Sequence, residues 1–264
     1  MSNPTVIHPS AIIHPTASVG AGCEVGPFCV IGAHVELGEN CWLQNQVTIM
    51  GPSKIGSNNK FYAFCSIGQQ TQDLKYSGEP THLQVGNGNT FREFVTVNRG
   101  TSPGASTRIG DEGNFLAYSH VAHDCTVGNR VIFSNNGTIA GHVEVGDHAI
   151  ISGLTAVHQF CRIGAYAITG GCSKIVQDVP PYTIADGNPA KIRGLNKVAL
   201  ERHGFSPAAQ QAIKDAYKLL YRSKLNLPEA LLRMETELPH LPEVVHFTSF
   251  LAATNRGVTR QSRV

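Results

Sequence analysis

The sequence predicts a mainly β protein, a parallel β-helix of hexapeptide repeats followed by a C-terminal α-helical domain. Two observations lead to this fold class. Of the 29 positions reached by counting every sixth residue from 7 to 175, 25 are Ile, Val, Leu or Phe, where about seven would be expected if a quarter of residues were of these types. Beyond residue 190 this period stops, and apolar residues recur at helical spacing.

The period of six identifies the type of repeat. A helix of 3.6 residues per turn cannot keep a strict six-residue stripe on one face, and a plain strand alternates every two residues. Short strands broken by a turn every six residues can keep it, and glycine often follows the apolar residue, as in Gly20, Gly26 and Gly32. Three such repeats make one triangular coil, so that residues i and i+18 stack about 4.8 Å apart. We therefore assign residues 1–190 to this solenoid.

Two polar segments interrupt the repeat. Residues 69–84 and 98–108 are rich in Gln, Thr, Pro, Gly and Ser and are predicted to be loop insertions. The first carries Gln72, Asp73 and Lys75, which can bind hydroxyls and a phosphate or carbonyl of a ligand; a solvated charged loop is the alternative interpretation. Loops that leave a rigid scaffold often carry function.

Residues 191–264 are predicted to form the helical domain. Ser206 followed by Pro207 is typical of a helix start and predicts a helix over residues 208–222. Further helices are expected from Pro228 to about residue 238 and from Pro242 to about residue 254. This region carries 12 Lys and Arg against 6 Asp and Glu, whereas residues 1–190 carry 9 against 13.

Composition excludes several classes of protein. With 41% hydrophobic and 15% charged residues the chain is too apolar to be disordered, and a net charge of +2 argues against a dedicated nucleic-acid binder. No apolar run reaches the roughly 18 residues of a membrane span. A signal peptide would begin with a positively charged segment, and here no Lys or Arg precedes Lys54. The seven cysteines form no CxxC pair, and we interpret them as reduced thiols. We expect a cytoplasmic protein without membrane insertion.

Histidines concentrate in the second half of the solenoid, at positions 120, 123, 142, 148 and 158. Stacking by 18 places Gly141 over His123 and His142 over Asp124. A carboxylate beside an imidazole fixes its tautomer and raises its basicity, and a neighbouring glycine N–H can face a developing oxyanion. Zinc needs three or four converging ligands, and these histidines do not obviously converge within one chain. We therefore expect no metal and no cofactor.

Four segments resemble the acyl-[acyl-carrier-protein]–UDP-N-acetylglucosamine O-acyltransferases of lipid A biosynthesis: GQQTQDLKYSGEPTH, AHDCTVGNRVIFSNNGTIAGHVEVGD, AVHQFCRIGAYAITGGCSKIVQDVPPY and ERHGFSPAAQQAIKDAYKLLYRS. The resemblance covers nearly the whole chain. It implies a homotrimer of left-handed parallel β-helices with active sites between neighbouring subunits. It also implies transfer of an (R)-3-hydroxyacyl chain from the thioester of acyl carrier protein to the 3-hydroxyl of UDP-N-acetylglucosamine, without a covalent intermediate.

The resemblance also implies roles for individual residues. His123 corresponds to the general base, Asp124 to its orienting partner and Gly141 to the backbone donor that faces the oxyanion. Asp73 and Lys75 correspond to a pair that contacts sugar and acyl chain, and Gly171 to the cap of the acyl channel. The remaining implied substrate contacts are Gln72, His120, His142, His158, Asn196 and Arg202. Gln159 is predicted as a further contact from its residue type. The basic tail, with Lys191, Arg193, Arg256 and Arg260 as candidates, would dock the acidic carrier protein.

Three positions depart from the family's pattern: Asn98 and His203, where His and Arg are usual, and Val198, where a Glu contacts the nucleotide. Some relatives prefer a 3-amino sugar. Three other functions stay open at this point. They are a hexapeptide enzyme that acylates an amine or uses acetyl-CoA, a zinc-dependent carbonic anhydrase of this fold, and a scaffold without catalysis.

Overall fold

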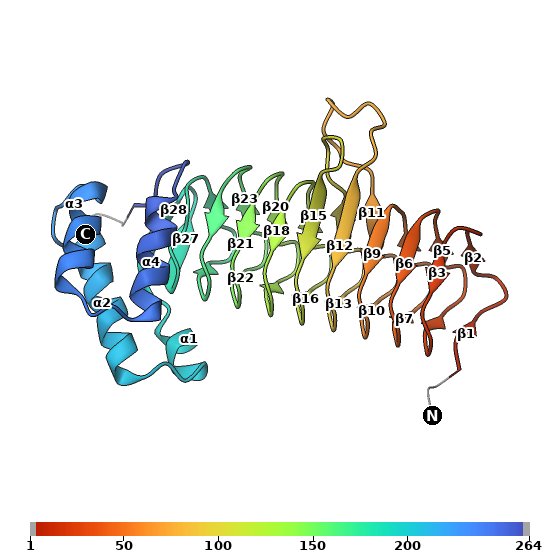
Figure 1. Cartoon of the computed structure of the whole chain (residues 1–264), viewed down its shortest axis with the longest axis horizontal. Helices are drawn as coiled ribbons and strands as arrows, with labels where there is room; N and C mark the ends of the chain where they lie inside the picture. The colour runs from red at the N-terminus through yellow and green to blue at the C-terminus, as the bar shows by residue number, and fades with distance from the viewer. Residues whose placement is uncertain (1–3, 261–264) are drawn as a thin grey trace.

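The computed structural model describes residues 4–260; residues 1–3 and 261–264, at the outer ends of the two predicted domains, lie outside the described residues. Figure 1 shows a long prism of stacked coils with helices at its C-terminal end. Three sheets of 11, 9 and 8 strands form its faces, called faces 1, 2 and 3 below, and their strands are parallel except for the last two strands of face 1. The predicted fold class, a left-handed parallel β-helix followed by a helical region, is confirmed.

Most strands contain only two or three residues, and each coil adds one strand to each face. Face 1 comprises β1 (Val6–Ile7), β4 (Glu24–Val25), β7 (Trp42–Leu43), β10 (Lys60–Phe61), β13 (Thr90–Phe91), β16 (Asn114–Phe115), β19 (Ile132–Phe133), β22 (Ile150–Ile151), β25 (Ile168–Thr169), β27 (Thr183–Gly187) and β28 (Ala190–Leu195). Face 2 comprises β2 (Ile12–Ile13), β5 (Val30–Ile31), β8 (Thr48–Ile49), β11 (Ser66–Gln69), β14 (Thr96–Asn98), β17 (His120–Val121), β20 (Thr138–Ile139), β23 (Ala156–Val157) and β26 (Lys174–Ile175). Face 3 comprises β3 (Ser18–Val19), β6 (Val35–Leu37), β9 (Ser53–Ile55), β12 (His82–Val85), β15 (Ser106–Ile109), β18 (Thr126–Val127), β21 (Glu144–Val145) and β24 (Arg162–Ile163).

The strand register shows how the two insertions fit the solenoid. In the regular coils outside them partners lie 18 residues apart, as in Ile49 with Ile67, and the last coil is two residues shorter, with Ile168 opposite Ile184. Ile55, however, pairs with Val85, which is 30 residues later, and Val85 pairs with Ile109, which is 24 later. The insertions are therefore two repeats and one repeat long, so the apolar stripe stays in phase across both.

The same register explains three of the four positions of the stripe that are not apolar. Asp73, Glu79 and Pro103 lie inside the insertions and never enter a coil. Thr169 is a true inward position, where its hydroxyl accepts from the Ser152 N–H at 2.9 Å and lies 3.1 Å from the Thr155 hydroxyl. The predicted loop limits overlap strands on both sides, and the segments between strands are 70–81 and 99–105.

Inward residues form continuous columns along the prism axis. Phe61, Phe91, Phe115 and Phe133 stack at ring-centroid distances of 5.1, 4.8 and 5.1 Å and are fully buried. Six cysteines fill buried corners as free thiols, as predicted: Cys23, Cys29, Cys41, Cys65, Cys125 and Cys161. The core thus runs the length of the solenoid instead of gathering in one centre.

The C-terminal region begins with an antiparallel hairpin, β27 and β28, which extends face 1. Four helices follow: α1 (Lys197–Arg202), α2 (Pro207–Tyr221), α3 (Leu227–Glu237) and α4 (Pro242–Ala252). The three predicted helices are confirmed within about two residues at each end, with Ser206 capping α2; α1 was not predicted. The expected division between residues 190 and 191 falls inside β28. Within residues 4–260 we find no helix long and apolar enough to cross a membrane.

The column of phenylalanines yields a stability prediction. Phe133 is fully buried in β19, whereas the preceding Ile132 faces outward and is 36% exposed. We expect Phe133→Ala to lower the free energy of unfolding by about 3–5 kcal/mol, because the column cannot collapse around the missing ring. Ile132→Ala is the matched control and should cost much less. Urea denaturation followed by circular dichroism measures both, and equal costs would contradict a core made of inward columns.

Candidate functional site

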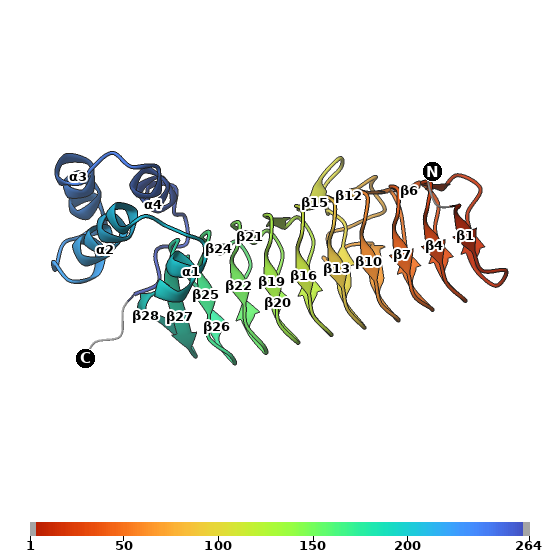
Figure 2. The ribbon, with the colours of Figure 1, turned by 90° about the horizontal axis from the view of Figure 1, so that it is seen from below.

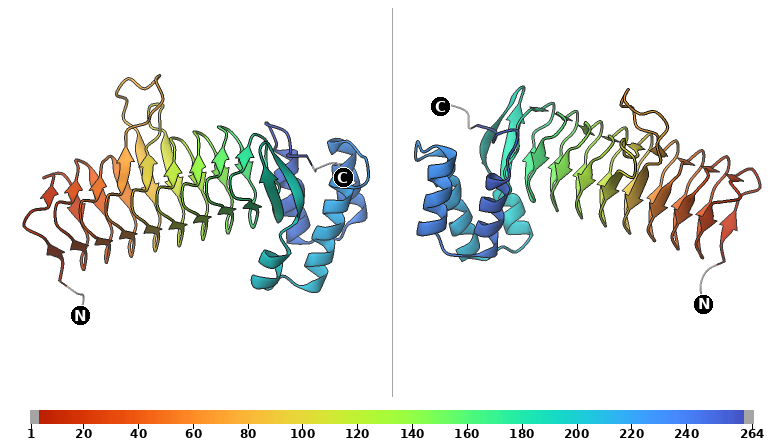
Figure 3. Two further views of the ribbon diagram at one scale, coloured as in Figure 1. Left: turned by 180° about the vertical axis from the view of Figure 1, so that it is seen from behind. Right: turned by 45° about the horizontal axis from the view of Figure 1, so that its top comes forward.

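The predicted catalytic residues gather where face 2 meets face 3, called corner 2–3 below. Val121 pairs with Ile139 and Ile139 with Val157, so the turns that follow these three residues stack on one another. Both insertions leave the solenoid at this same corner in adjacent coils, and Figure 3 shows them projecting from one edge of the prism. The repeat therefore brings histidines from three coils beside two polar loops.

His123 and Asp124 form the centre of the site. His123 Nδ1 lies 2.8 Å from Asp124 Oδ2, and both side chains are mostly shielded from solvent. An ionised carboxylate can only accept, so the Nδ1–H donates to it and His123 Nε2 carries the free lone pair. Asp124 occupies the left-handed region at φ 59°, which Asp tolerates better than most residues. This tautomer is the one that a general base needs.

Asp124 is held from several sides. Its Oδ1 accepts from the Thr101 N–H at 3.1 Å, and its own N–H donates to Thr107 Oγ1 at 2.8 Å. Burial by itself raises the pKa of the Asp124 carboxyl, but the hydrogen bonds from His123 and Thr101 together outweigh burial and leave that pKa below its usual value. Asp124 is therefore ionised at neutral pH and stabilises a positive charge on His123.

Gly141 lies directly against the His123 ring, as stacking predicts. A Cβ at this position would come within 2.6 Å of His123 Nε2 and 2.4 Å of Cε1, so any side chain would displace the imidazole. The Gly141 carbonyl accepts from the Phe160 N–H at 3.1 Å. Its N–H makes no hydrogen bond within residues 4–260. A free backbone donor thus lies beside the lone pair of His123.

His142 completes the central cluster. Its Nε2 lies 3.7 Å from Asp124 Oδ2, and its ring meets the His123 ring edge to face with centroids 5.3 Å apart. Phe160 stacks on its other side at 4.5 Å. The predicted placement of His142 over Asp124 is correct. The expectation that histidines do not converge within one chain is wrong for His123 and His142.

The other predicted histidines divide into two groups. His120 Nδ1 lies 2.7 Å from the Thr96 hydroxyl; burial, and then its neighbour His123, lower the pKa of His120 and keep it neutral. His158 is exposed next to Gln159, and its Nδ1 lies 3.1 Å from the Arg256 guanidinium. His148 instead stacks on Tyr166 at another corner of the prism, where face 3 meets face 1.

The first insertion reaches the corner through hydroxyl groups. Thr71 Oγ1 lies 2.8 Å from Thr101 Oγ1 and accepts from the Asp73 N–H at 3.1 Å. Asp73 Oδ1 in turn accepts from the Lys75 N–H at 2.9 Å. Gln72 and Lys75 are exposed. The base of this loop is thus joined to the second insertion through Thr71 and Thr101, and its charged residues follow directly after that contact.

Three predicted contact residues lie elsewhere in the same chain. Gly171 is in a turn between faces 1 and 2, where an added Cβ would meet nothing closer than Gly153 O at 3.6 Å. Asn196 caps α1, with its amide donating to Tyr166 O and accepting from the Ala199 N–H. Arg202 is exposed at the end of α1. Figure 2 shows α1 beside β27, several coils away from the insertions.

Sequence reasoning missed Thr71, Thr101 and Thr107. Threonine is common in loops, and nothing in its spacing distinguishes these three from the others. Only the folded chain shows that Thr101 contacts His123, that Thr107 contacts Asp124, and that Thr71 reaches the pair through Thr101. Cys125, adjacent in sequence, has a buried side chain that donates to Ala140 O, and burial raises the pKa of its thiol to about 12. It therefore has no thiolate at neutral pH.

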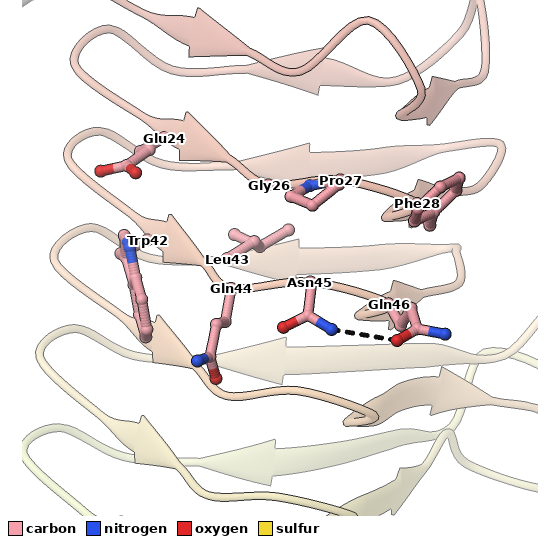
Figure 4. A pocket seen from close by; sticks show the side chains of 9 residues that line it. All are labelled: Glu24, Gly26, Pro27, Phe28, Trp42, Leu43, Gln44, Asn45 and Gln46. Carbon is pink, nitrogen blue, oxygen red and sulfur yellow. Dashed lines mark hydrogen bonds between the residues drawn. The ribbon is translucent and has the colours of Figure 1, made fainter.

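Two hollows of the surface lie away from this corner. One of about 380 Å³ is on the N-terminal coils, lined by Phe28, Trp42, Gln46 and their neighbours (Figure 4). The other, of about 210 Å³, lies between face 3 and α4 beside His246 and Phe250. Neither contains a predicted site residue, so the cluster at corner 2–3 remains the candidate site.

Comparison with known proteins matches two families. The one described as UDP N-acetylglucosamine O-acyltransferase, domain 2, covers residues 178–259, and the bacterial transferase hexapeptide repeat covers residues 4–38. Among solved structures, LpxA from Acinetobacter baumannii is 41% identical over 97% of this chain and 100% of its own, with a TM-score of 0.93. LpxA from Bacteroides fragilis, a UDP-N-acetylglucosamine acyltransferase, is 38% identical over 97% and 100%, with a TM-score of 0.94. UDP-N-acetylglucosamine O-acyltransferase from Moraxella catarrhalis is 41% identical over 96% and 99%, with a TM-score of 0.93.

The central cluster yields a prediction about metals. Ligand atoms of His123, Asp124 and His142 lie within 4.8 Å of one another, a set that zinc accepts. The His123 Nδ1–H, however, already donates a hydrogen bond to Asp124, and a zinc ion bound between these two groups would have to displace that proton. We expect purified protein to contain far less than one zinc per chain by elemental analysis, before and after dialysis against EDTA. One equivalent of zinc that EDTA removes would instead favour the carbonic anhydrase interpretation.

Proposed function

The chain belongs to the family of UDP-N-acetylglucosamine O-acyltransferases, and from this membership we propose that it moves an (R)-3-hydroxyacyl chain from acyl carrier protein to the 3-hydroxyl of UDP-N-acetylglucosamine. The product would be the first intermediate of lipid A biosynthesis. The observation that supports the proposal most directly is the His123–Asp124 pair, whose free Nε2 lies against Gly141.

The geometry supports direct transfer by general-base catalysis. The sugar hydroxyl attacks the thioester carbon while its proton passes to His123 Nε2. The new C–O bond leaves a tetrahedral intermediate whose oxyanion accepts from the Gly141 N–H. When the intermediate collapses, the C–S bond breaks and His123 returns the proton to the departing sulfur. Asp124 stabilises the imidazolium that exists between these two steps.

No covalent acyl-enzyme is needed in this scheme. The nearest thiol is that of Cys125, which is fully buried and protonated. A nucleophilic cysteine needs a partly exposed, electropositive setting that favours the thiolate. The surroundings of Cys125 have the opposite effect, so its thiol serves packing.

The separation of the contact residues supports a homotrimer. Gly171, Asn196 and Arg202 lie away from corner 2–3 of their own chain, although the resemblance assigns all of them to one substrate complex. They can meet a substrate held by His123 only if a neighbouring subunit presents them. We therefore place the active site between subunits. Because the Asn196 amide is already engaged in capping α1, Arg202 is the stronger candidate for the nucleotide.

The basic C-terminal residues support docking of the acidic carrier protein. Arg256 contacts His158 at corner 2–3, so it joins the tail to the catalytic coils. Arg260 lies next to β28, where its carbonyl accepts from the Ile192 N–H at 2.9 Å. Arg193 is the weakest candidate because Asp186 lies 3.3 Å from its guanidinium. Positive charge beside the site would steer an acidic partner towards His123.

Replacing the base tests the reaction. We expect His123→Ala to lower kcat by about 10²–10⁴, measured as transfer of radiolabelled UDP-N-acetylglucosamine to product with a series of 3-hydroxyacyl carrier proteins. His34→Ala is the matched control, an exposed histidine at the same corner of an N-terminal coil. Full activity of His123→Ala would show that His123 is not the base. If the wild-type protein forms no product with any acyl chain, the proposed acceptor or donor is wrong.

Charge reversal tests carrier-protein docking. We expect Arg256→Glu to raise the KM for the acylated carrier protein at low salt, and less so at high salt, because screening weakens steering. Arg233→Glu is the control, since this exposed arginine on α3 pairs with Glu237 in its own helix. Equal effects of both variants, or none of Arg256→Glu, would place the docking surface elsewhere.

A further inference from the structure

We propose that Thr101 is a positioning residue for the His123–Asp124 pair, and that Thr71 couples it to the loop that carries Asp73 and Lys75. The inference rests on the proposed function, because it takes His123 as the base. It adds two residues to which neither the resemblance nor the comparisons assign a role. The observation that supports it is an unbroken line of contacts, which runs from the Asp73 backbone through the hydroxyls of Thr71 and Thr101 to the His123 imidazole.

Thr101 holds both members of the catalytic pair. Its Oγ1 lies 2.9 Å from His123 Nδ1, and its backbone N–H donates to Asp124 Oδ1 at 3.1 Å. Thr101 is only 9% exposed and lies in the second insertion, outside the regular coils. One buried loop residue therefore limits rotation of the imidazole and of the carboxylate together.

The direction of the hydrogen bonds follows from Asp124. Its carboxylate lies 2.8 Å from His123 Nδ1 and can only accept, so Nδ1 carries the proton. Thr101 Oγ1 is then a second acceptor for the same proton. Its own hydroxyl hydrogen is free to point at Thr71 Oγ1, 2.8 Å away. The opposite direction would put the proton on Nε2 and leave Nδ1 and the carboxylate facing each other as two acceptors.

Thr71 extends the line into the substrate loop. It is 5% exposed, and its Oγ1 also accepts from the Asp73 N–H at 3.1 Å. Asp73 in turn holds the Lys75 N–H through its side chain. A change in the position of this loop is therefore passed to Thr101 through a buried contact. When sugar and acyl groups bind to this loop, the contact from Thr71 to Thr101 would align His123.

Kinetics of hydroxyl-deletion variants test the inference. We expect Thr101→Val to lower kcat about fivefold to tenfold, the size of one lost hydrogen bond, with little change in KM. Thr101→Ser, which restores the hydroxyl, should recover most of that loss. Thr183→Val is the control because Thr183 is also a buried threonine, and its hydroxyl donates to Pro180 O at the far end of the solenoid. A loss in Thr101→Val no larger than in Thr183→Val would overturn the positioning role.

The pH profile separates positioning from a merely structural effect. The hydroxyl stabilises the Nδ1–H of the imidazolium more than that of the neutral ring, so its removal should move the acidic limb of kcat/KM down by a few tenths of a pH unit. The titratable groups that face His123, namely Asp124, His120 and His142, are unchanged in this variant. An unmoved acidic limb would contradict contact between the hydroxyl and the base.

A double-mutant cycle tests the coupling itself. If Thr71 acts through Thr101, the kcat losses of Thr71→Val and Thr101→Val are less than additive in the double variant. Fully additive losses would overturn the coupling. His123→Gln serves as the reference: if it keeps wild-type activity, the proposed function fails. If it is inactive while Thr101→Val behaves as wild type, only the present inference fails.

Discussion

The stacking of one coil on the next is the constraint on which the rest of the structure depends. Each inward apolar residue needs a partner of the same kind one coil later, because its neighbours along the strand are turns. The columns of Phe61, Phe91, Phe115 and Phe133 show this requirement met by aromatic rings. These columns fix how the turns between strands stack at each corner, and the stacked turns at one corner bring the residues of the candidate site together. His123, Gly141 and Phe160 come together because their turns occupy equivalent places in three successive coils.

On this rigid frame the chemistry needs few groups. Asp124 sets the tautomer of His123, and Gly141 leaves room for the ring and offers a free N–H. The second insertion adds polar contacts through Thr101. Each of these groups has a physical requirement of its own. The carboxylate must stay charged while partly buried, which its hydrogen bonds achieve, and the residue against the imidazole must lack a Cβ.

The sequence was most informative where a residue's environment repeats. The fold class, the cysteine corners and the stacking of Gly141 on His123 all follow from counting, because the same geometry recurs in every coil. Prediction failed where the chain leaves the period. The contacts of Thr101 depend on the path of a loop, and α1 is too short for a periodic signal. Thr169 is a separate case, because it keeps the period while its polar side chain is satisfied by hydrogen bonds inside the core. Asn196 illustrates another limit, since its residue type fits a ligand contact and a helix cap equally well.

The lengths of the two insertions have a consequence for how such a protein can change. Because each adds whole repeats, the strands after it return to their columns without a shift, and coils on either side keep their contacts. A segment of any other length would rotate later residues from inside to outside unless the loop absorbed the difference. Solenoid coils contact only their neighbours, so new loops can be accommodated at one corner at local cost. The corner that carries both insertions is thus the part of this architecture most open to diversification, while the faces away from it preserve its shape.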